Sequence, residues 1–249
     1  MANGSLSPRR IYFEVKLYEY SEVANTSTYW VIFELLWRDF FRYVAIKHGR
    51  KIFHLSGIMG REIAWKRDTG MFEKWARGET GVPFVDASMR ELLHTGWMSN
   101  RSRQNVASFL VKDLHLDWRM GAEWFESLLL DHDVSSNYGN WNYSAGIGTD
   151  PRLDRKFNVV KQALDYDPDG EFVKLWLPEL KDVPAEKVHF PWRLTDGELA
   201  RYNVKLGQDY PRPVVQAPEW GKFMKSTQEK GKGQQRGVDF YFKSSNPKN

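Results

Sequence analysis

The segment between Asp131 and Arg155 combines carboxylates, amides and large aromatic rings within a short stretch of chain. It reads DHDVSSNYGNWNYSAGIGTDPR at its start, and such an abundance of Asn, Ser and Gly is typical of loops. A loop of this kind inside a helical protein usually binds a ligand. Asp131 and Asp133 are the paired carboxylates best placed for chemistry, with a solvent-exposed helix end as the alternative interpretation.

Redox chemistry in this chain would need a cofactor or aromatic side chains. Cys is absent, which excludes disulfides, thiol nucleophiles and Cys-ligated zinc, while 11 Trp residues are present. The sequence contains no Walker loop, no GxGxxG and no metal-ligand spacing among its 6 His residues. A net charge of +4 is compatible with a polyanionic partner such as DNA.

The hydrophobic pattern of the chain predicts the helices that must position these polar and aromatic side chains. The longest covers 26–47, where Glu34 and Arg38 lie four residues apart and predict a charged pair on a buried helix. Further helices are expected at 70–77, 85–94, 104–114, 121–130 and 171–180. We expect one helical domain over 1–217 and a flexible basic tail over 218–249.

The location of the protein is left open by the sequence. No stretch approaches the roughly 18 apolar residues of a membrane span, and the opening MANGSLSPRR lacks the apolar core of a secretory signal. We expect a protein without a membrane span, and nucleus, plastid and mitochondrion are all compatible with the sequence.

Three blocks of sequence together resemble the flavin domain of the photolyase/cryptochrome family, and in particular its DASH type. They are FELLWRDFFR, TGWMSNRSRQNVASFLVKDLHLDWRMGAEWF and DHDVSSNYGNWNYSAGIGTDPR, and the match spans most of 27–192. A match this long and rich in rare residues is more specific than a short motif. The resemblance implies an all-α, helical FAD-binding domain.

The resemblance also assigns residues to a flavin pocket. It implies that Asn137 faces the reducible edge of the isoalloxazine and that Arg103 and Asp131 form a buried ion pair against the ring. Asp133 would accept a hydrogen bond from the ring's imide edge.

Three further residues match positions in the flavin cavity, each with a plainer alternative. Arg38 could instead form a helix-packing salt bridge, Asn100 could cap a helix, and Trp97 could be an ordinary core aromatic.

The resemblance further implies an electron relay from flavin to surface through Trp141, Trp118 and Trp65. The alternative for any one of them is core packing. Trp65 also keeps the family's ten-residue spacing to Trp75.

Contacts to damaged DNA are implied as well. Glu34 would protonate or hydrogen-bond a thymine carbonyl, and Trp37 would stack on a flipped-out pyrimidine dimer beside Asn137. Gln104 and Tyr143 stand where conventional photolyases carry Met and Trp, and both resemble the DASH group, which favours single-stranded DNA. The implied reaction is light-driven repair of cyclobutane pyrimidine dimers by electron transfer from reduced FAD.

The sequence departs from the family pattern at its start. Only GSLSPRR remains of the segment that holds the FAD diphosphate, and nothing corresponds to the family's antenna domain, so no second chromophore is implied. The missing hydrogen bonds, each about 1.5–3 kcal/mol when charge-assisted, predict weak or lost FAD binding. The alternatives to repair are therefore a blue-light photoreceptor or redox-signalling flavoprotein, and a flavin-free structural subunit.

The tail contains a candidate protein-binding peptide, QRGVDFYF. Gln235, Val238, Tyr241 and Phe242 have the spacing of a sliding-clamp-binding motif, whose apolar anchors dock in a groove. The alternative is a strand or aromatic plug that packs on the protein's own body.

Overall fold

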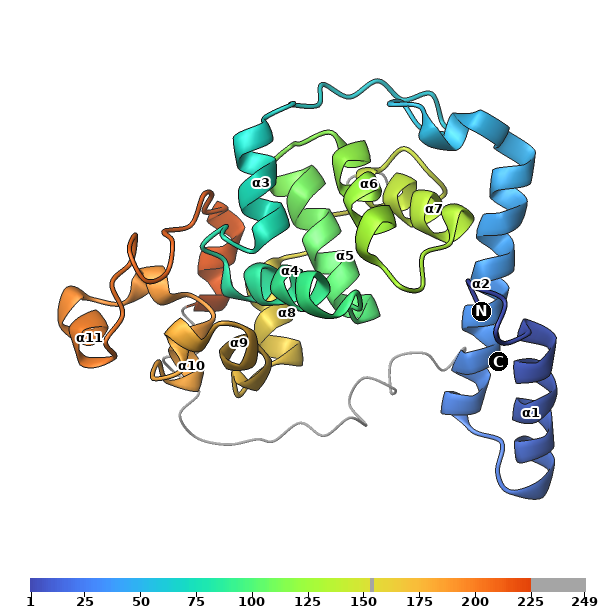
Figure 1. Cartoon of the computed structure of the whole chain (residues 1–249), viewed down its shortest axis with the longest axis horizontal. Coiled ribbons are helices and arrows are strands. Elements are labelled where there is room, and N and C mark those ends of the chain that lie inside the picture. The colour runs from blue at the N-terminus through green and yellow to red at the C-terminus, as the bar shows by residue number, and fades with distance from the viewer. Residues whose placement is uncertain (153–154, 225–249) are drawn as a thin grey trace.

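A computed structural model of the chain describes residues 1–152 and 155–224. Helices form all of its regular secondary structure over these two ranges, apart from two isolated β-bridges. The expected all-α fold is therefore confirmed (Figure 1). The α-helices are α1 (Pro8–Ser21), α2 (Thr26–His48), α3 (Thr69–Arg77), α4 (Pro83–Thr95), α5 (Asn100–Ser108), α6 (Trp118–Leu128), α7 (Val134–Ala145), α8 (Val159–Tyr166), α9 (Glu171–Trp176), α10 (Ala185–Val188) and α11 (Asp196–Arg201).

Five short elements of other helical types connect or extend these helices. Of these, η2 is a π-helical continuation of α5, and the others are 3-10 turns. They are η1 (Gly49–Phe53), η2 (Phe109–Asp113), η3 (Pro178–Leu180), η4 (Pro191–Arg193) and η5 (Pro218–Trp220).

Local capping signals account for the ends of the helices around the site. The Asn25 side chain accepts from two backbone amides and forms a capping box that starts α2. Asp133 caps the start of α7, and Gly146 ends α7 in the left-handed conformation that glycine adopts without strain.

The hydrophobic core has two parts. The larger includes the fully buried rings of Trp75, Trp118 and Trp220 and lies among α3, α4, α5, α6 and α7. The smaller surrounds Leu177 and Tyr210. In Figure 1, α1 and α2 lie at one side of this body, and α2 packs on α7 and η1.

Several expectations about these elements are wrong. The stretch after Asp131 contains α7 rather than a continuous loop, and α1 was not expected. The helix over 26–47 exists but is mostly exposed, and Arg38 Nη1 bonds Asp39 Oδ1 at 2.6 Å rather than Glu34. Trp220 is fully buried, so the packed domain continues past the tail boundary expected at 217.

Candidate functional site

Two adjoining cavities lie between α2, α5 and α7. The inner one has a volume of about 360 Å³ and the outer one about 1210 Å³. Glu34, Arg103, Gln104 and Asp131 line both, so the two cavities form one continuous site. The inner cavity is further lined by Trp97, Met98, Asn100, Ala107, Phe125, Leu129, His132, Asp133, Ser136, Asn137, Asn140, Trp141 and Ser144.

One face of α7 supplies much of the inner wall. Ser136, Asn137, Asn140, Trp141 and Ser144 follow the spacing of neighbours on a helix, with i, i+1, i+4, i+5 and i+8 on one side. Ser136, Asn140 and Ser144 were not predicted as site residues. The helical spacing was the signal that could have found them, and reading the segment as a loop concealed it.

The predicted ion pair between Arg103 and Asp131 is present. Arg103 Nη2 donates to Asp131 Oδ1 at 3.1 Å and Oδ2 at 3.0 Å, and Nε donates to the Met98 carbonyl at 2.8 Å. The pair is not buried as expected, because the Asp131 side chain is 54% exposed at the cavity mouth. It therefore presents both a cation and a carboxylate to the cavity.

Asn137 and Asp133 each use one polar atom in the protein. Asn137 Nδ2 donates to the Ala122 carbonyl at 2.9 Å, which fixes the amide on α6. Asp133 Oδ1 accepts from the Ser136 amide at 2.9 Å, so Asp133 caps the start of α7 and is only partly exposed there. Both residues also line the inner cavity, where Asn137 Oδ1 and Asp133 Oδ2 remain for a ligand.

The structural alternatives considered for Trp97, a core aromatic, and for Asn100, a helix cap, are both wrong. Trp97 is 52% exposed at the inner cavity and is not a core aromatic. Asn100 is the first residue of α5, whereas Ser99 caps that helix by accepting from the Ser102 amide. The neighbouring Gln104 accepts from Arg101 Nη1 at 2.8 Å through Oε1.

Four of the residues predicted to contact DNA line the outer cavity: Glu34 and Trp37 from α2, Gln104 from α5 and Tyr143 from α7. Arg38, which was predicted to line the flavin cavity, lines the outer cavity and not the inner one. Tyr143 Oη accepts from Arg155 Nη1 at 3.0 Å, an anchor that the sequence did not reveal.

Charged residues of both signs line the outer cavity. Five arginines slightly outnumber four carboxylates there, and Arg38, Arg103 and Arg155 are paired with carboxylates. The arginines are Arg38, Arg42, Arg101, Arg103 and Arg155, and the carboxylates are Glu34, Asp131, Asp133 and Asp150.

The three predicted relay tryptophans differ in burial. Trp141 is 2% exposed and lines the inner cavity, Trp118 is fully buried, and Trp65 is half-buried. The ring of Trp141 contacts Phe125 at 5.2 Å and Trp75 at 6.3 Å between centroids. Over 1–152 and 155–224, no ring contact joins Trp141 to Trp118 directly, so a step between them would cross the packing around Gly121.

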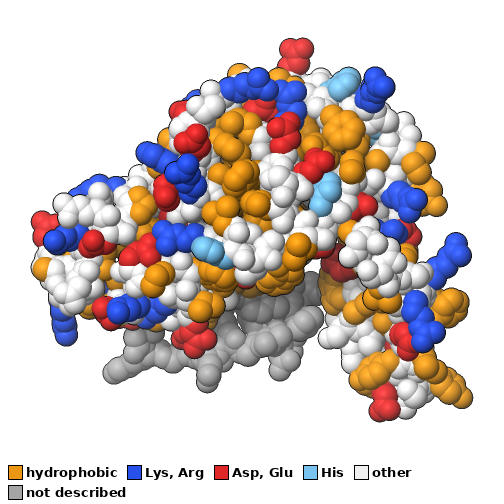
Figure 2. Space-filling model, in the orientation of Figure 1, with side chains coloured by type: hydrophobic (Ala, Val, Ile, Leu, Met, Phe, Trp, Pro, Cys, Tyr) orange, Lys and Arg blue, Asp and Glu red, His pale blue; other side chains and the backbone are white. Residues whose placement is uncertain are grey.

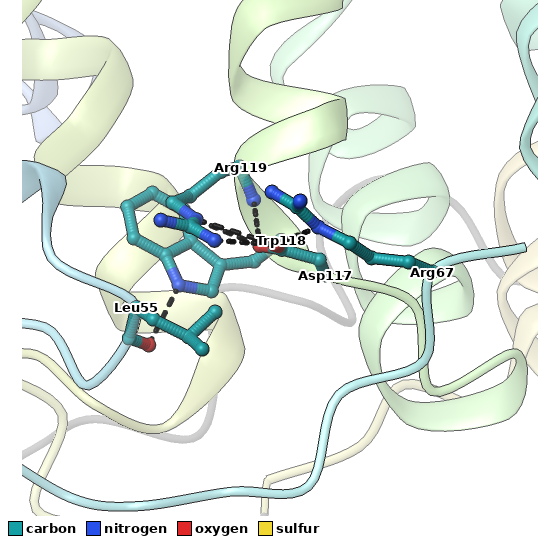
Figure 3. A network of polar contacts seen from close by, with 5 residues as sticks. All are labelled: Leu55, Arg67, Asp117, Trp118 and Arg119. Carbon is teal, nitrogen blue, oxygen red and sulfur yellow. Dashed lines mark hydrogen bonds and ion pairs between the residues drawn. The ribbon is translucent and has the colours of Figure 1, made fainter. Parts of the chain in front are cut away.

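A polar network holds Trp118 in place (Figure 3). The indole Nε1 donates to the Leu55 carbonyl at 3.1 Å, and the preceding residue, Asp117, accepts from Arg119 at 2.7 Å and Arg67 at 3.3 Å. Burial alone would raise the pKa of Asp117, but the hydrogen bonds from both arginines bring it below its ordinary value.

The lining of the inner cavity fits a flat heteroaromatic ring with polar edges. Arg103 and Asp131 offer a cation and a carboxylate, Asn137 an amide oxygen, and Trp97 and Trp141 aromatic walls. Both ring nitrogens of His132 are buried there without a hydrogen bond, and its Nε2 lies 3.8 Å from Glu126 Oε1. The isoalloxazine of FAD has this chemistry, so the residues present fit the cofactor.

Other site types find no support in the described part of the chain. Among residues 1–152 and 155–224, no cluster of three His, Asp or Glu side chains could hold a metal ion. No helix in these ranges is long and apolar enough to cross a membrane. Gln235, Val238, Tyr241 and Phe242 lie outside the described residues.

Comparison with known proteins identifies the family. The family "FAD binding domain of DNA photolyase" matches residues 30–229. Cryptochrome DASH of Xenopus laevis is 56% identical over 97% of this chain and 49% of its own length. A relative from Oryza sativa, named "Cryptochrome DASH, chloroplastic/mitochondrial", is 59% identical over 77% of this chain and 33% of its own length.

A solved structure shares the fold. The crystal structure of a Synechocystis cryptochrome superposes with a TM-score of 0.85 at 55% identity, over 92% of this chain and 47% of that one. The chain therefore spans about half the length of the cryptochrome from Xenopus laevis and that from Synechocystis. Its sequence and fold place it in the cryptochrome/photolyase family, where it carries the helical FAD-binding domain of a DASH-type cryptochrome.

Proposed function

We propose that the chain binds FAD in the inner cavity and works as a light-driven flavoprotein on DNA. One observation carries this proposal: Asn137, the Arg103–Asp131 pair and Trp141 all line the same 360 Å³ cavity. When bound and reduced, FAD supplies the electron that a lesion takes up under blue light and then returns.

The inner cavity would hold the isoalloxazine through the atoms that the protein leaves available. Asn137 Oδ1 can accept from a protonated ring nitrogen, and Asp133 can accept from an imide N–H. Arg103 places a cation where negative charge develops on the ring, and Asp131 keeps that cation paired.

The outer cavity would hold a flipped-out cyclobutane pyrimidine dimer. Glu34 borders both cavities, so its carboxyl can hydrogen-bond a thymine carbonyl beside the flavin. Trp37 and Tyr143 offer faces for stacking, and Gln104 borders the same space. A preference for single-stranded DNA fits the smaller ring at Tyr143, because bases that are already unpaired need less stacking energy to enter.

The number of pyrimidine dimers that remain after illumination tests the repair proposal. The purified chain with FAD, a reductant and a single-stranded oligonucleotide containing one dimer is illuminated with blue light. We expect loss of the dimer only with light and FAD together, and a slower loss in Glu34→Gln. Flavin that photoreduces while the dimer count stays constant would contradict repair and favour a photoreceptor or redox-signalling role.

A second candidate is a structural subunit that binds a partner polypeptide. Phe13, Tyr20 and Tyr43 on α1 and α2 are 65%, 91% and 70% exposed, and hydrophobic side chains are visible on this part of the surface (Figure 2). The partner would be a polypeptide with an apolar face that covers these exposed aromatic rings. Co-purification of the chain with such a partner as a stable complex without flavin would support the structural role over the light-driven function.

We also propose a cellular compartment and a partner for the C-terminal tail. The name of the rice relative supports a plastid or mitochondrion, and the positive charge of the chain is equally compatible with the nucleus. Tail residues Gln235, Val238, Tyr241 and Phe242 would bind a sliding clamp, and a tail peptide titrated against a purified clamp tests this.

A further inference from the structure

The core residue Tyr138 lies between two aromatic rings, the buried Trp118 and the exposed Phe53, one turn of α7 before Asn142. Its ring meets Trp118 edge-on at 6.2 Å and 82°, and meets Phe53 edge-on at 4.6 Å and 76°. The side chain is only 7% exposed. Tyr138 is therefore the aromatic neighbour of the central relay tryptophan.

The hydroxyl of Tyr138 has a base as its partner. It donates to Glu126 Oε2 at 2.8 Å, from α7 to α6. The Glu126 side chain is 45% exposed, so its carboxylate connects the buried phenol to water. Burial, together with the hydrogen bond to Glu126 and the nearby negative charge, holds the pKa of Tyr138 well above its usual range.

We propose that Tyr138 reduces the oxidised Trp118 and that Glu126 takes up the phenolic proton in the same step. One electron passes from the phenol to the Trp118 radical cation, and the O–H bond of Tyr138 breaks. The products are neutral Trp118, a neutral tyrosyl radical and a protonated Glu126. The oxidant is a photo-oxidised indole of the relay, so this inference rests on the proposed function.

The hydrogen-bond partners of the two rings favour this direction of transfer. Trp118 Nε1 donates to the backbone carbonyl of Leu55, which is a poor base, so the oxidised indole keeps its proton and stays a strong oxidant. The phenol of Tyr138 instead donates to a carboxylate at a distance suited to proton transfer. Loss of the proton leaves no charge on the buried tyrosine, which avoids the cost of an unpaired buried cation.

The step would also separate charge for longer. A deprotonated tyrosyl radical can regain its electron only when a proton returns from Glu126. Because that carboxyl group is in contact with water, its proton can leave to solvent. The oxidising equivalent then rests beside Trp118, away from the inner cavity.

The test uses two substitutions that keep the size of the side chain. Tyr138→Phe keeps the ring between Trp118 and Phe53, and Glu126→Gln keeps an acceptor oxygen but removes the base. Matched controls are Tyr202→Phe, which packs on the smaller part of the core, and Glu73→Gln on α3, whose charge does not act on Tyr138.

The main readout is electron paramagnetic resonance of FAD-loaded protein with ring-deuterated tyrosine, frozen under illumination. Photoreduction of the flavin is followed in the same sample by absorption. We expect a tyrosyl signal in the wild type and in both controls. In Tyr138→Phe that signal is lost and the tryptophan radical persists, and in Glu126→Gln the signal is greatly reduced.

A second readout needs no flavin, so that failure of the proposed function can be told apart from failure of this inference. Azide radicals made by pulse radiolysis oxidise tryptophan in the apoprotein, and transfer from tyrosine is followed by absorption. We expect a lower tyrosyl yield in Tyr138→Phe than in Tyr202→Phe. An unchanged tyrosyl signal in Tyr138→Phe by both methods would overturn the inference, even where flavin photoreduces normally.

Discussion

Arg103 and Asp131 are joined by two hydrogen bonds from a single guanidinium nitrogen, at 3.1 and 3.0 Å. The bonds join α5 to the connection between α6 and α7. A third hydrogen bond, from Arg103 Nε to the Met98 carbonyl, fixes the guanidinium at the start of α5. This arrangement holds a cation in a set position at the inner cavity.

Arg103→Lys should weaken FAD binding while keeping the charge. An ammonium cannot bond both Asp131 and the Met98 carbonyl in the planar geometry of a guanidinium. Loss of one charge-assisted hydrogen bond, about 1.5–3 kcal/mol, corresponds to an affinity lower by roughly ten- to a hundredfold. Isothermal titration with FAD measures this, with Arg193→Lys as the control. Equal affinities for the two variants would contradict the assigned role.

Trp141→Phe should slow photoreduction of the flavin more than Trp192→Phe, because Trp141 borders the inner cavity. Trp118→Phe tests the predicted next step, and Trp75→Phe tests the ring that Trp141 contacts at 6.3 Å. The rate of bleaching under constant blue light, with a reductant present, is the measurement. If Trp75→Phe slows bleaching and Trp118→Phe does not, the relay assigned by resemblance is wrong after its first member.

Gly139→Ala should destabilise the protein. A Cβ at Gly139 would lie 2.3 Å from the Phe41 ring, where α7 packs on α2. Overpacking of this kind costs about 1–3 kcal/mol. The control is Gly197→Ala on α11, where a Cβ meets nothing within 4 Å, and we expect no loss of stability there.

Urea unfolding followed by tryptophan fluorescence gives both values. If Gly139→Ala and Gly197→Ala unfold at the same urea concentration, the close packing of α2 on α7 is incorrect.

Asp86 should make stability depend on pH. Burial raises its pKa to about 6 from 3.8, although hydrogen bonds from Thr80, Tyr210 and Gly81 oppose the rise. The folded state therefore keeps this proton at pH values where the unfolded chain has lost it. The resulting stability is fully present below pH 3.8 and is lost as the pH rises through 6, a change of about 3 kcal/mol.

The free energies of unfolding of the wild type and Asp86→Asn, measured by urea between pH 4 and 7.5, test this. The difference between the two proteins should shift in favour of Asp86→Asn as the pH rises. Parallel curves would contradict a raised pKa. If Asp86→Asn does not fold, the carbon chemical shift of the Asp86 carboxyl in the wild type reads the pKa directly.

The sequence predicted most helices but misjudged the segment that carries the site. Asn, Ser and Gly dominate α7 and have weak helix propensity, so the segment reads as a loop. Tertiary contacts override that propensity: Asn142 Nδ2 bonds the carbonyls of Ile52 and Tyr138, and Asp133 caps the first turn. Partners 90 residues away along the chain cannot be read from local composition.

The positions of the site residues were predicted more accurately than their interactions. Resemblance brought Asn137, Arg103 and Asp131 to one cavity, because it transfers positions within a fold. It could not predict that Arg38 pairs with Asp39, since the side-chain rotamers of Arg38 and its neighbours decide which carboxylate it meets. The helix α1 buries none of its residues, so its apolar side chains do not mark a core-facing stripe of the kind that identified the other helices.

An absorption spectrum of the purified chain with FAD, before and during blue illumination with a reductant, tests the light-driven function most directly. We expect a protein-bound flavin spectrum that bleaches in the light, and slower bleaching in Trp141→Phe. A chain that takes up no flavin from excess FAD would contradict the light-driven function and leave the structural role.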